Sequence, residues 1–289
     1  MVAPGMLQNP SVRNWLGGIE PAWTLLDLAS FNALRKPPAP RGAAIRLASD
    51  LTPEEIGQSA MTRNALILLH AASVGPGLKL TATGNLSRQV VAEMCELFTW
   101  PGFDKAEAFR LHKVVNEPDF LPLFLVRHLV EASGLVKKRN GNLKITPTGE
   151  RTLESPGRNA LQALLFHMAF WMADLSYLSR GNLGNWPQQH AGIVLWSLSV
   201  SATDWTSPER LARLCTIPIN GVLDQPYDKA SYATEGVILR PLNAFGLLEH
   251  RADPIPDQRY GKAHFYRKSL LFDRFLSFDV KLEAACPRH

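Results

Sequence analysis

The clearest structural signal in the sequence is GLVKKRNGNLKITPTG, residues 134–149. Two short runs with strand character, LVKKR and NLKIT, flank Asn140 and Gly141. This pair favours a type I′ turn, because both residues tolerate positive φ. Gly134 stands where a helix over the preceding residues would stop. The sequence therefore predicts a helix that ends at Gly134 and leads directly into a basic β-hairpin.

The chain before this hairpin opens with a linker and a helix start. Residues 1–50 are rich in Pro and Gly, KPPAPRG (36–42) is expected to be a stiff extended linker, and PAWTLLDLASFNAL before it predicts a short helix. In LTPEEIG, Thr52 is the expected N-cap, Pro53 occupies the first helical position and Glu55 completes a capping box. The helix is expected to continue through TRNALILLHAAS.

The next signals are a turn, a short strand and more helices. After GPG at 75–77, LKLT predicts a strand from residue 78, and Ser87 is expected to cap a helix in RQVVAEMCELF. A further helix is predicted in KAEAFRLHKVV (105–115). Without that extra helix, the predicted order of helix, strand, helix, helix and hairpin matches a winged-helix domain.

A second copy of the pattern follows the apolar window 160–178, which we interpret as one buried helix. The run AGIVLWSLSV predicts a helix, and Thr206 with Glu209 predicts a second capping box. The GLL at 246–248 repeats the GLV of the first hairpin, HFYRKS predicts the returning strand, and LLFDRFLSF predicts a closing apolar helix. The first strand of this copy has no clear signal.

Two motifs, LKLTATGNL (78–86) and LVEASGLVKKRNGNLKITPTG (129–149), resemble those of tandem winged-helix domains in uncharacterised bacterial proteins, some of them carried on plasmids or mobile elements. The resemblance covers roughly residues 52–280. It implies a mainly α fold with small β-hairpins (α+β), built from tandem winged-helix-turn-helix domains. The expected organisation is an N-terminal arm and Pro-rich linker (1–50), winged-helix domain 1 (51–158), and a long apolar helix plus winged-helix domain 2 (159–289).

The helix before Gly134 is apolar on both of its faces, so we expect it to be buried rather than placed in a DNA groove. Exposing a Leu or Phe forgoes about 1.5–3 kcal/mol each. We expect the 160–178 helix, the N-terminal segment or a second subunit to cover it. The candidate interface residues are Leu121, Phe124, Leu125, Leu129, Phe170 and Trp171.

The second copy carries the polar and basic groups that suit nucleic acid, and Pro241 is expected to distort its last helix. An ordinary solvated hairpin is the alternative for these charges. The cations of the first hairpin serve equally well to contact phosphate or to discourage edge-to-edge strand pairing. The candidate nucleic-acid-binding residues are Thr234, Arg240, Arg251, Arg259, Lys262, Arg267 and Lys268 in the second copy, and Lys137, Lys138 and Arg139 in the first hairpin.

Nothing in the sequence nominates an enzyme. The motifs GxSxG, GxGxxG and GxxxxGK[ST] are absent, and no HxxxH, HxH or CxxC spacing occurs. We therefore expect no catalytic residues, metal or cofactor. Cys95 and Cys215 are expected to be small core residues. No signal peptide or membrane span is predicted, which favours the cytoplasm, and the formal net charge of +5 permits a polyanionic partner without demanding one.

The sequence thus favours a non-enzymatic winged-helix protein that binds DNA or RNA, or regulates something that does, through phosphate contacts of the second domain. The alternative is a protein–protein interaction or assembly module, as a homo-oligomer or with another partner, in which the winged helices are scaffolds. The first hypothesis requires one open face that carries its main cations while the first domain's helix is buried. The two hypotheses can be distinguished by whether the cations Arg240, Arg259, Lys262 and Arg267 lie on that face and whether Leu125 and Leu129 lie in the core.

Overall fold

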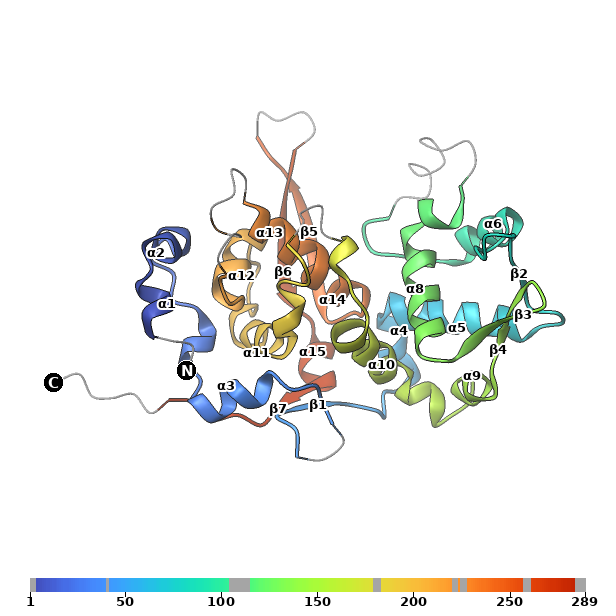
Figure 1. Cartoon of the computed structure of the whole chain (residues 1–289), viewed down its shortest axis with the longest axis horizontal. Coiled ribbons are helices and arrows are strands. Elements are labelled where there is room, and N and C mark those ends of the chain that lie inside the picture. Colours follow the sequence, from blue (N-terminus) through green and yellow to red (C-terminus); the bar gives the residue numbers. More distant parts are fainter. Residues whose placement is uncertain are drawn as a thin grey trace. The chain divides into compact units, whose positions relative to one another are not determined.

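This computed structural model describes residues 4–39, 42–103, 115–178, 183–219, 223, 228–256 and 261–283 (Figure 1). The chain forms two compact units. Unit 1 contains residues 1–47, 174–243 and 247–289, and unit 2 contains residues 48–173 and 244–246. The fold is a mixture of helices and small antiparallel sheets, which agrees with the expected α+β class. Among the described residues, no helix is both long and apolar enough to cross a membrane.

Unit 2 is built from helices around one small sheet. Its helical elements are α4 (Pro53–Gln58), α5 (Ala60–Ser73), α6 (Arg88–Leu97), the 3₁₀ turn η2 (Glu117–Asp119), α8 (Leu121–Ala132), α9 (Pro147–Thr152), α10 (Gly157–His167) and the π-helical segment η3 (Met168–Met172). The predicted capping box is confirmed, because the Thr52 side chain accepts from the Glu55 N–H and the Glu55 carboxylate accepts from the Thr52 N–H. Ser87 caps α6 as expected. The helix expected over 105–115 lies almost wholly outside the described residues.

The sheet of unit 2 has three antiparallel strands in the order β2 (Leu78–Lys79), β4 (Asn142–Ile145) and β3 (Val136–Arg139) (Figure 1). The predicted hairpin is therefore confirmed. Asn140 and Gly141 both have positive φ, at 50° and 72°, as a type I′ turn requires. Gly134 ends α8 with φ of 67°.

Helix α8 is buried on both faces, as its apolar pattern predicted. It packs against α5, α6 and η3 within unit 2. Leu123 and Val126 on one face and Leu125 and Leu129 on the other are each at most 3% exposed. Most of α8 therefore belongs to the core of unit 2.

A buried ion pair holds the turn that contains the motif TATGNL (81–86). Arg127 of α8 donates through Nη1 to both carboxylate oxygens of Glu117, at 2.7 and 2.6 Å, and through Nη2 to the Gly84 carbonyl at 2.8 Å. Glu117 also accepts from the Leu86 N–H at 2.5 Å. The motif therefore belongs to the scaffold that places strand β2.

The apolar window 160–178 is not one helix, so this prediction was wrong. Helix α10 gives way to η3, in which the Ala173 N–H bonds the Met168 carbonyl, and Ala173 is extended with ψ of 149°. After that, the Asp174 side chain accepts from the Ser176 N–H and starts a 3₁₀ turn. The N–H of Ala173 makes the i→i−5 hydrogen bond of a π turn, and the helical pattern ends there. The chain leaves unit 2 after this residue.

Unit 1 combines the N-terminal segment with the C-terminal half. Its helical elements are α1 (Pro4–Gln8), α2 (Pro10–Leu16), η1 (Ala22–Leu25), α3 (Leu28–Leu34), η4 (Ser176–Leu178), η5 (Gln188–His190), α11 (Ala191–Ser201), α12 (Pro208–Cys215), α13 (Lys229–Thr234), the π-helical segment η6 (Glu235–Leu239), α14 (Arg240–Ala244) and α15 (Leu270–Phe275). Its strands are β1 (Ile45–Leu47), β5 (Leu248–Pro254), β6 (Lys262–Lys268) and β7 (Leu276–Phe278).

Residues 1–47 belong to this unit rather than forming the separate arm expected for residues 1–50. Strand β1 pairs antiparallel with β7, and the Trp23 indole N–H donates to the Thr216 carbonyl at 3.0 Å. The closing apolar helix was also predicted too long: α15 ends at Phe275, and Leu276 begins the strand that pairs with β1. The place of the N-terminal segment and the end of α15 both depend on contacts with residues distant in the sequence.

The second hairpin, β5 with β6, is confirmed and longer than the first. Its third strand is reduced to a bridge in which Thr206 and Tyr266 exchange both main-chain hydrogen bonds. Because Thr206 is engaged there, Ser207 rather than Thr206 is the N-cap of α12, so the predicted box with Glu209 was wrong. The distortion expected at Pro241 takes the form of η6, in which the Arg240 N–H bonds the Glu235 carbonyl.

The junction between last helix and hairpin has the same hydrogen bonds in both halves of the chain. Gly134 and Gly246 each have positive φ, at 67° and 76°. The recurring main-chain bonds, donor to acceptor, are Leu135 to Val130 and Thr146 to Leu135 in one half, and Leu247 to Leu242 and Ser269 to Leu247 in the other.

Candidate nucleic-acid interface

The outer face of the three-stranded sheet in unit 2 gathers four cations. Cross-strand register places Lys79 of β2, Asn142 of β4 and Arg139 of β3 in one row, and Lys144 opposite Lys137 in the next. Directly opposite residues share a face and successive residues alternate. We call the set Lys79, Lys137, Arg139, Asn142 and Lys144 the cationic sheet face.

The opposite face of the same sheet points into the core of unit 2. Leu78, Leu143 and Val136 on that face are each at most 7% exposed. Lys138 shares this side by alternation, and its ammonium extends to Glu131 at 3.5 Å. The core therefore fixes which cations face outward, and Lys138 is not among them.

The four outward cations have no ion-pair partner within the described ranges of the chain. Lys79, Lys137 and Arg139 are exposed, and Lys144 is partly buried. The stem of Lys144 runs past Gly77, where an added Cβ would lie 3.0 Å from Lys144 Cγ and 2.5 Å from the Leu143 carbonyl oxygen. Gly77 thus leaves room for this lysine to lie along the sheet.

These cations lie close enough to repel one another. Same-face residues along a strand are about 6.6 Å apart and neighbouring strands about 4.8 Å apart. Both spacings are shorter than the Debye length of about 10 Å at 0.1 M salt. Like charges directly opposite, such as Lys137 and Lys144, destabilise a strand pair. The arrangement costs stability in the free protein, and a bound polyanion would relieve that cost.

The second hairpin, which the sequence favoured, is neutralised by its own carboxylates. Arg251 pairs with Asp253 at 3.0 Å, and Arg267 pairs with Glu249 at 2.6 Å. All four charged residues lie on the outer face of β5–β6, so the charges of that face cancel. The guanidinium carbons of Arg251 and Arg267 also lie 5.0 and 4.6 Å from the Trp205 ring.

The other candidates of the second copy are dispersed. Lys268 pairs with Asp273 at 2.7 Å, Arg240 pairs with Glu235 at 3.4 Å, and Thr234 is buried and bonds the Ala230 carbonyl. Lys262 is exposed, but alternation puts it on the opposite side of β6 from Arg267. Arg259 lies outside the described residues. The nucleic-acid hypothesis required these cations to share one open face. Arg240, Lys262 and Arg267, the three that the structure describes, do not form such a face.

The candidate interface residues are largely used inside unit 2. Leu125, Leu129 and Phe170 are buried, and the Phe170 ring packs 4.5 Å from that of Phe166. Phe124 and Trp171 are partly buried, and Leu121 is 45% exposed. Intramolecular packing therefore covers most of the apolar surface that could have met a partner.

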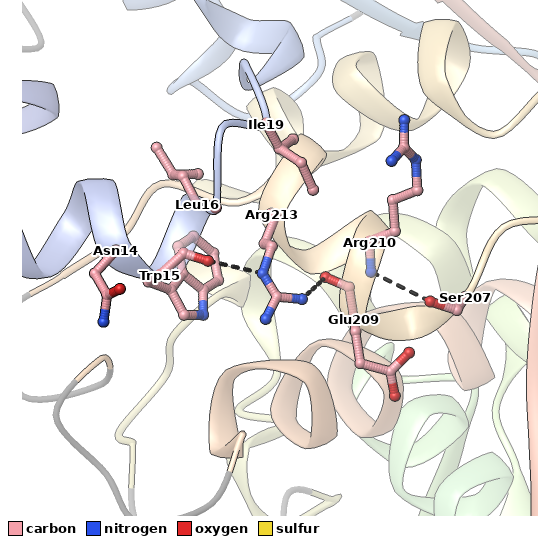
Figure 2. Close-up of a pocket in the computed structure, with 9 residues that line it drawn as sticks. Asn14, Trp15, Leu16, Ile19, Ser207, Glu209, Arg210 and Arg213 are labelled. Atoms are coloured by element: carbon pink, nitrogen blue, oxygen red, sulfur yellow. Dashed lines mark hydrogen bonds between the residues drawn. The ribbon is translucent and has the colours of Figure 1, made fainter.

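A pocket of about 360 Å³ in unit 1 lies beside α2 and the first turns of α12 (Figure 2). Arg213 crosses it, donating from Nε to the Trp15 carbonyl at 2.8 Å and from Nη1 to the Glu209 carbonyl at 2.9 Å. Arg213 also pairs with Asp228 at 3.4 Å. This guanidinium ties α2 to α12, and each of its three nitrogens already donates a hydrogen bond within unit 1.

Both described cysteines lie in the core, as the sequence predicted. Cys95 and Cys215 are buried, and burial raises the pKa of the Cys215 thiol well above its usual range. In the described part of the chain, no three His, Cys, Asp or Glu side chains are arranged to hold a metal ion.

Comparison with known proteins bears on unit 2. Residues 57–158 match the model of the Y4jL N-terminal domain. The chain is 30% identical over 112 residues to the uncharacterized protein y4jL of Sinorhizobium fredii. The match covers 39% of this chain and 50% of that protein, so the chain spans about half the length of the curated relative it matches. No solved structure matches.

The matched stretch contains the whole cationic sheet face. The resemblance to an uncharacterised bacterial protein is thus confirmed. The predicted binding residues did not include Lys79 or Lys144, although strand alternation in LKLT and NLKIT places each lysine on the side of the sheet away from the neighbouring buried leucine. It also overlooked Glu249 and Asp253, which alternate with Arg251 in the second hairpin.

Proposed function

We propose that this protein binds double-stranded nucleic acid through the phosphate backbone, using the cationic sheet face of unit 2 on a tandem winged-helix scaffold. The scaffold is supported by the recurring order of helix, strand or bridge, helix, helix and hairpin, and by the matching bonds at Gly134 and Gly246. The role is one of binding rather than catalysis.

The observation that carries the proposal is the one-sided gathering of Lys79, Lys137, Arg139 and Lys144 without carboxylate partners among the described residues. Cations of this kind contact phosphates and position a protein on nucleic acid. The second hairpin, with its internal ion pairs, is the weaker candidate.

The same face suits a duplex better than a single strand. Single-strand binders use aromatic side chains as stacking platforms, and the cationic sheet face carries only Lys, Arg and Asn. Most of helix α8 is buried, so it offers few side chains to base edges. We therefore expect binding with little sequence preference.

The test is a fluorescence anisotropy titration of the full chain with a duplex of about 20 base pairs, at KCl concentrations from about 50 to 200 mM. Four phosphate contacts give a slope of log K against log salt of about −3.6, a loss of roughly 150-fold across this range. Duplexes of unrelated sequence should bind alike. Absence of binding at the lowest salt would refute the proposal, and a slope near zero would refute the phosphate contacts.

A further inference from the structure

The inner face of the second hairpin in unit 1 holds two histidines in direct contact. His250 of β5 and His264 of β6 are diagonal neighbours, with Nε2 of His250 2.8 Å from Nδ1 of His264. Their rings are stacked, with centroids 5.0 Å apart. His250 also stacks on Tyr266 with centroids 4.8 Å apart.

These histidines face Glu235, the first residue of the π-helical segment η6. Tyr266 donates its hydroxyl to Glu235 Oε1 at 2.9 Å, and His264 Nδ1 lies 3.6 Å from the same oxygen. The Glu235 side chain is only 10% exposed. Hairpin and helix therefore meet through one polar cluster, and π-helical turns often mark functional positions.

Only one proton can lie between His250 Nε2 and His264 Nδ1. When both rings are neutral, one nitrogen donates and the other accepts. When one ring is protonated, the N–H still donates to the neutral partner. When both are protonated, two N–H groups face each other across 2.8 Å, so the contact must open.

The charges around the pair do not favour the second proton. Glu235 faces it from η6, but Arg240 of α14 pairs with the same oxygen at 3.4 Å. Lys262 and Lys268 share the inner face of β6, and Lys268 is paired with Asp273. Burial is the main cause that lowers the pKa of His250, and the positive charges of His264 and Arg240 lower it further. Glu235 raises this pKa.

We propose that the His250–His264 pair is a pH-sensitive contact that holds the β5–β6 hairpin on η6 at neutral pH and releases it on acidification. Because the folded protein disfavours protonation of His250, the unfolded or opened hairpin binds protons at higher pH. Stability from this contact is full above the ordinary histidine value of about 6.5 and is lost as pH falls below it. The inference uses unit 1 and does not depend on the proposed nucleic-acid binding.

The test is hydrogen exchange of the full chain at pH 7.5 and 5.5, corrected for the intrinsic pH dependence of amide exchange. We expect the opening constant of the β5 and β6 amides to rise at the lower pH, by at most about tenfold per pH unit for each proton taken up. The amides of β3 and β4, a hairpin without histidine, serve as the internal control and should not change.

Replacing His250→Gln or His264→Gln removes one titrating ring but retains hydrogen-bonding capacity, so either variant should show a smaller pH response. Should both variants fail to fold, the ring protons of the wild-type histidines can be followed by NMR. Two coupled titration steps, with His250 shifted low, would support the inference. Independent titration of both rings at ordinary values, or equal protection of β5 and β6 at both pH values, would overturn it.

Discussion

Neutralising the like-charged pair Lys137 and Lys144 should weaken nucleic-acid binding while it stabilises the protein. The variant Lys137→Gln/Lys144→Gln removes two of the four cations of the cationic sheet face. The salt slope should then fall in magnitude from about 3.6 to about 1.8. At about 0.1 M salt the same loss corresponds to roughly 60-fold weaker binding.

The stability effect has the opposite sign. Lys137 and Lys144 lie directly opposite each other on adjacent strands, and such like-charge pairs cost about 0.2–1 kcal/mol. Chemical denaturation should therefore show an equal or slightly larger free energy of unfolding for the double variant. A variant that binds less because it is misfolded would show the reverse.

The matched control is Lys138→Gln, one residue away on the opposite side of β3. Lys138 pairs with Glu131 and does not belong to the cationic sheet face. Its salt slope should equal that of the wild type. An unchanged slope in the double variant, or the same decrease in the control, would refute the assignment of phosphate contacts to this face.

Three further predictions concern the scaffold, and each is read from urea or thermal unfolding. Thr52→Ala removes the capping box of α4 and should cost about 0.5–2 kcal/mol; an unchanged midpoint would mean that the box contributes nothing. Glu117→Ala leaves Arg127 buried without its carboxylate and should cost about 3–5 kcal/mol, so a loss under 1 kcal/mol would contradict a tight buried pair. Gly149→Ala drives a Cβ into a main-chain carbonyl oxygen and should cost about 1–3 kcal/mol, whereas Gly57→Ala, with open space around it, should be neutral or stabilising.

Local signals in the sequence predicted local structure well. The capping box at Thr52, the turn at Asn140 and the stop at Gly134 all form as expected. Each depends on residues within a few positions of one another, so side-chain chemistry and φ preferences decide it. The burial of α8 was also predictable, because a helix that is apolar on both faces has to be covered.

Predictions failed where a distant partner competes with the local signal. Thr206 has a side chain that suits an N-cap, but its backbone pairs with Tyr266. Ser207 is therefore the N-cap of α12. Leu276 continues an apolar run, but β1 offers it a strand partner more than two hundred residues earlier in the chain. The members of both pairs are too far apart in the sequence for a local residue pattern to reveal the pairing.

Local residue patterns alone specify two basic hairpins in this chain, each following a helix and a left-handed glycine. Which hairpin leaves its cations without carboxylate partners among the described residues depends on contacts in three dimensions. That outcome depends on strand register: it sets Glu249 and Asp253 beside the arginines of β5–β6, and places Lys79 in a row with Arg139 across β2–β4–β3. A Coulomb interaction depends on distance in space, and strand pairing, rather than chain order, sets that distance.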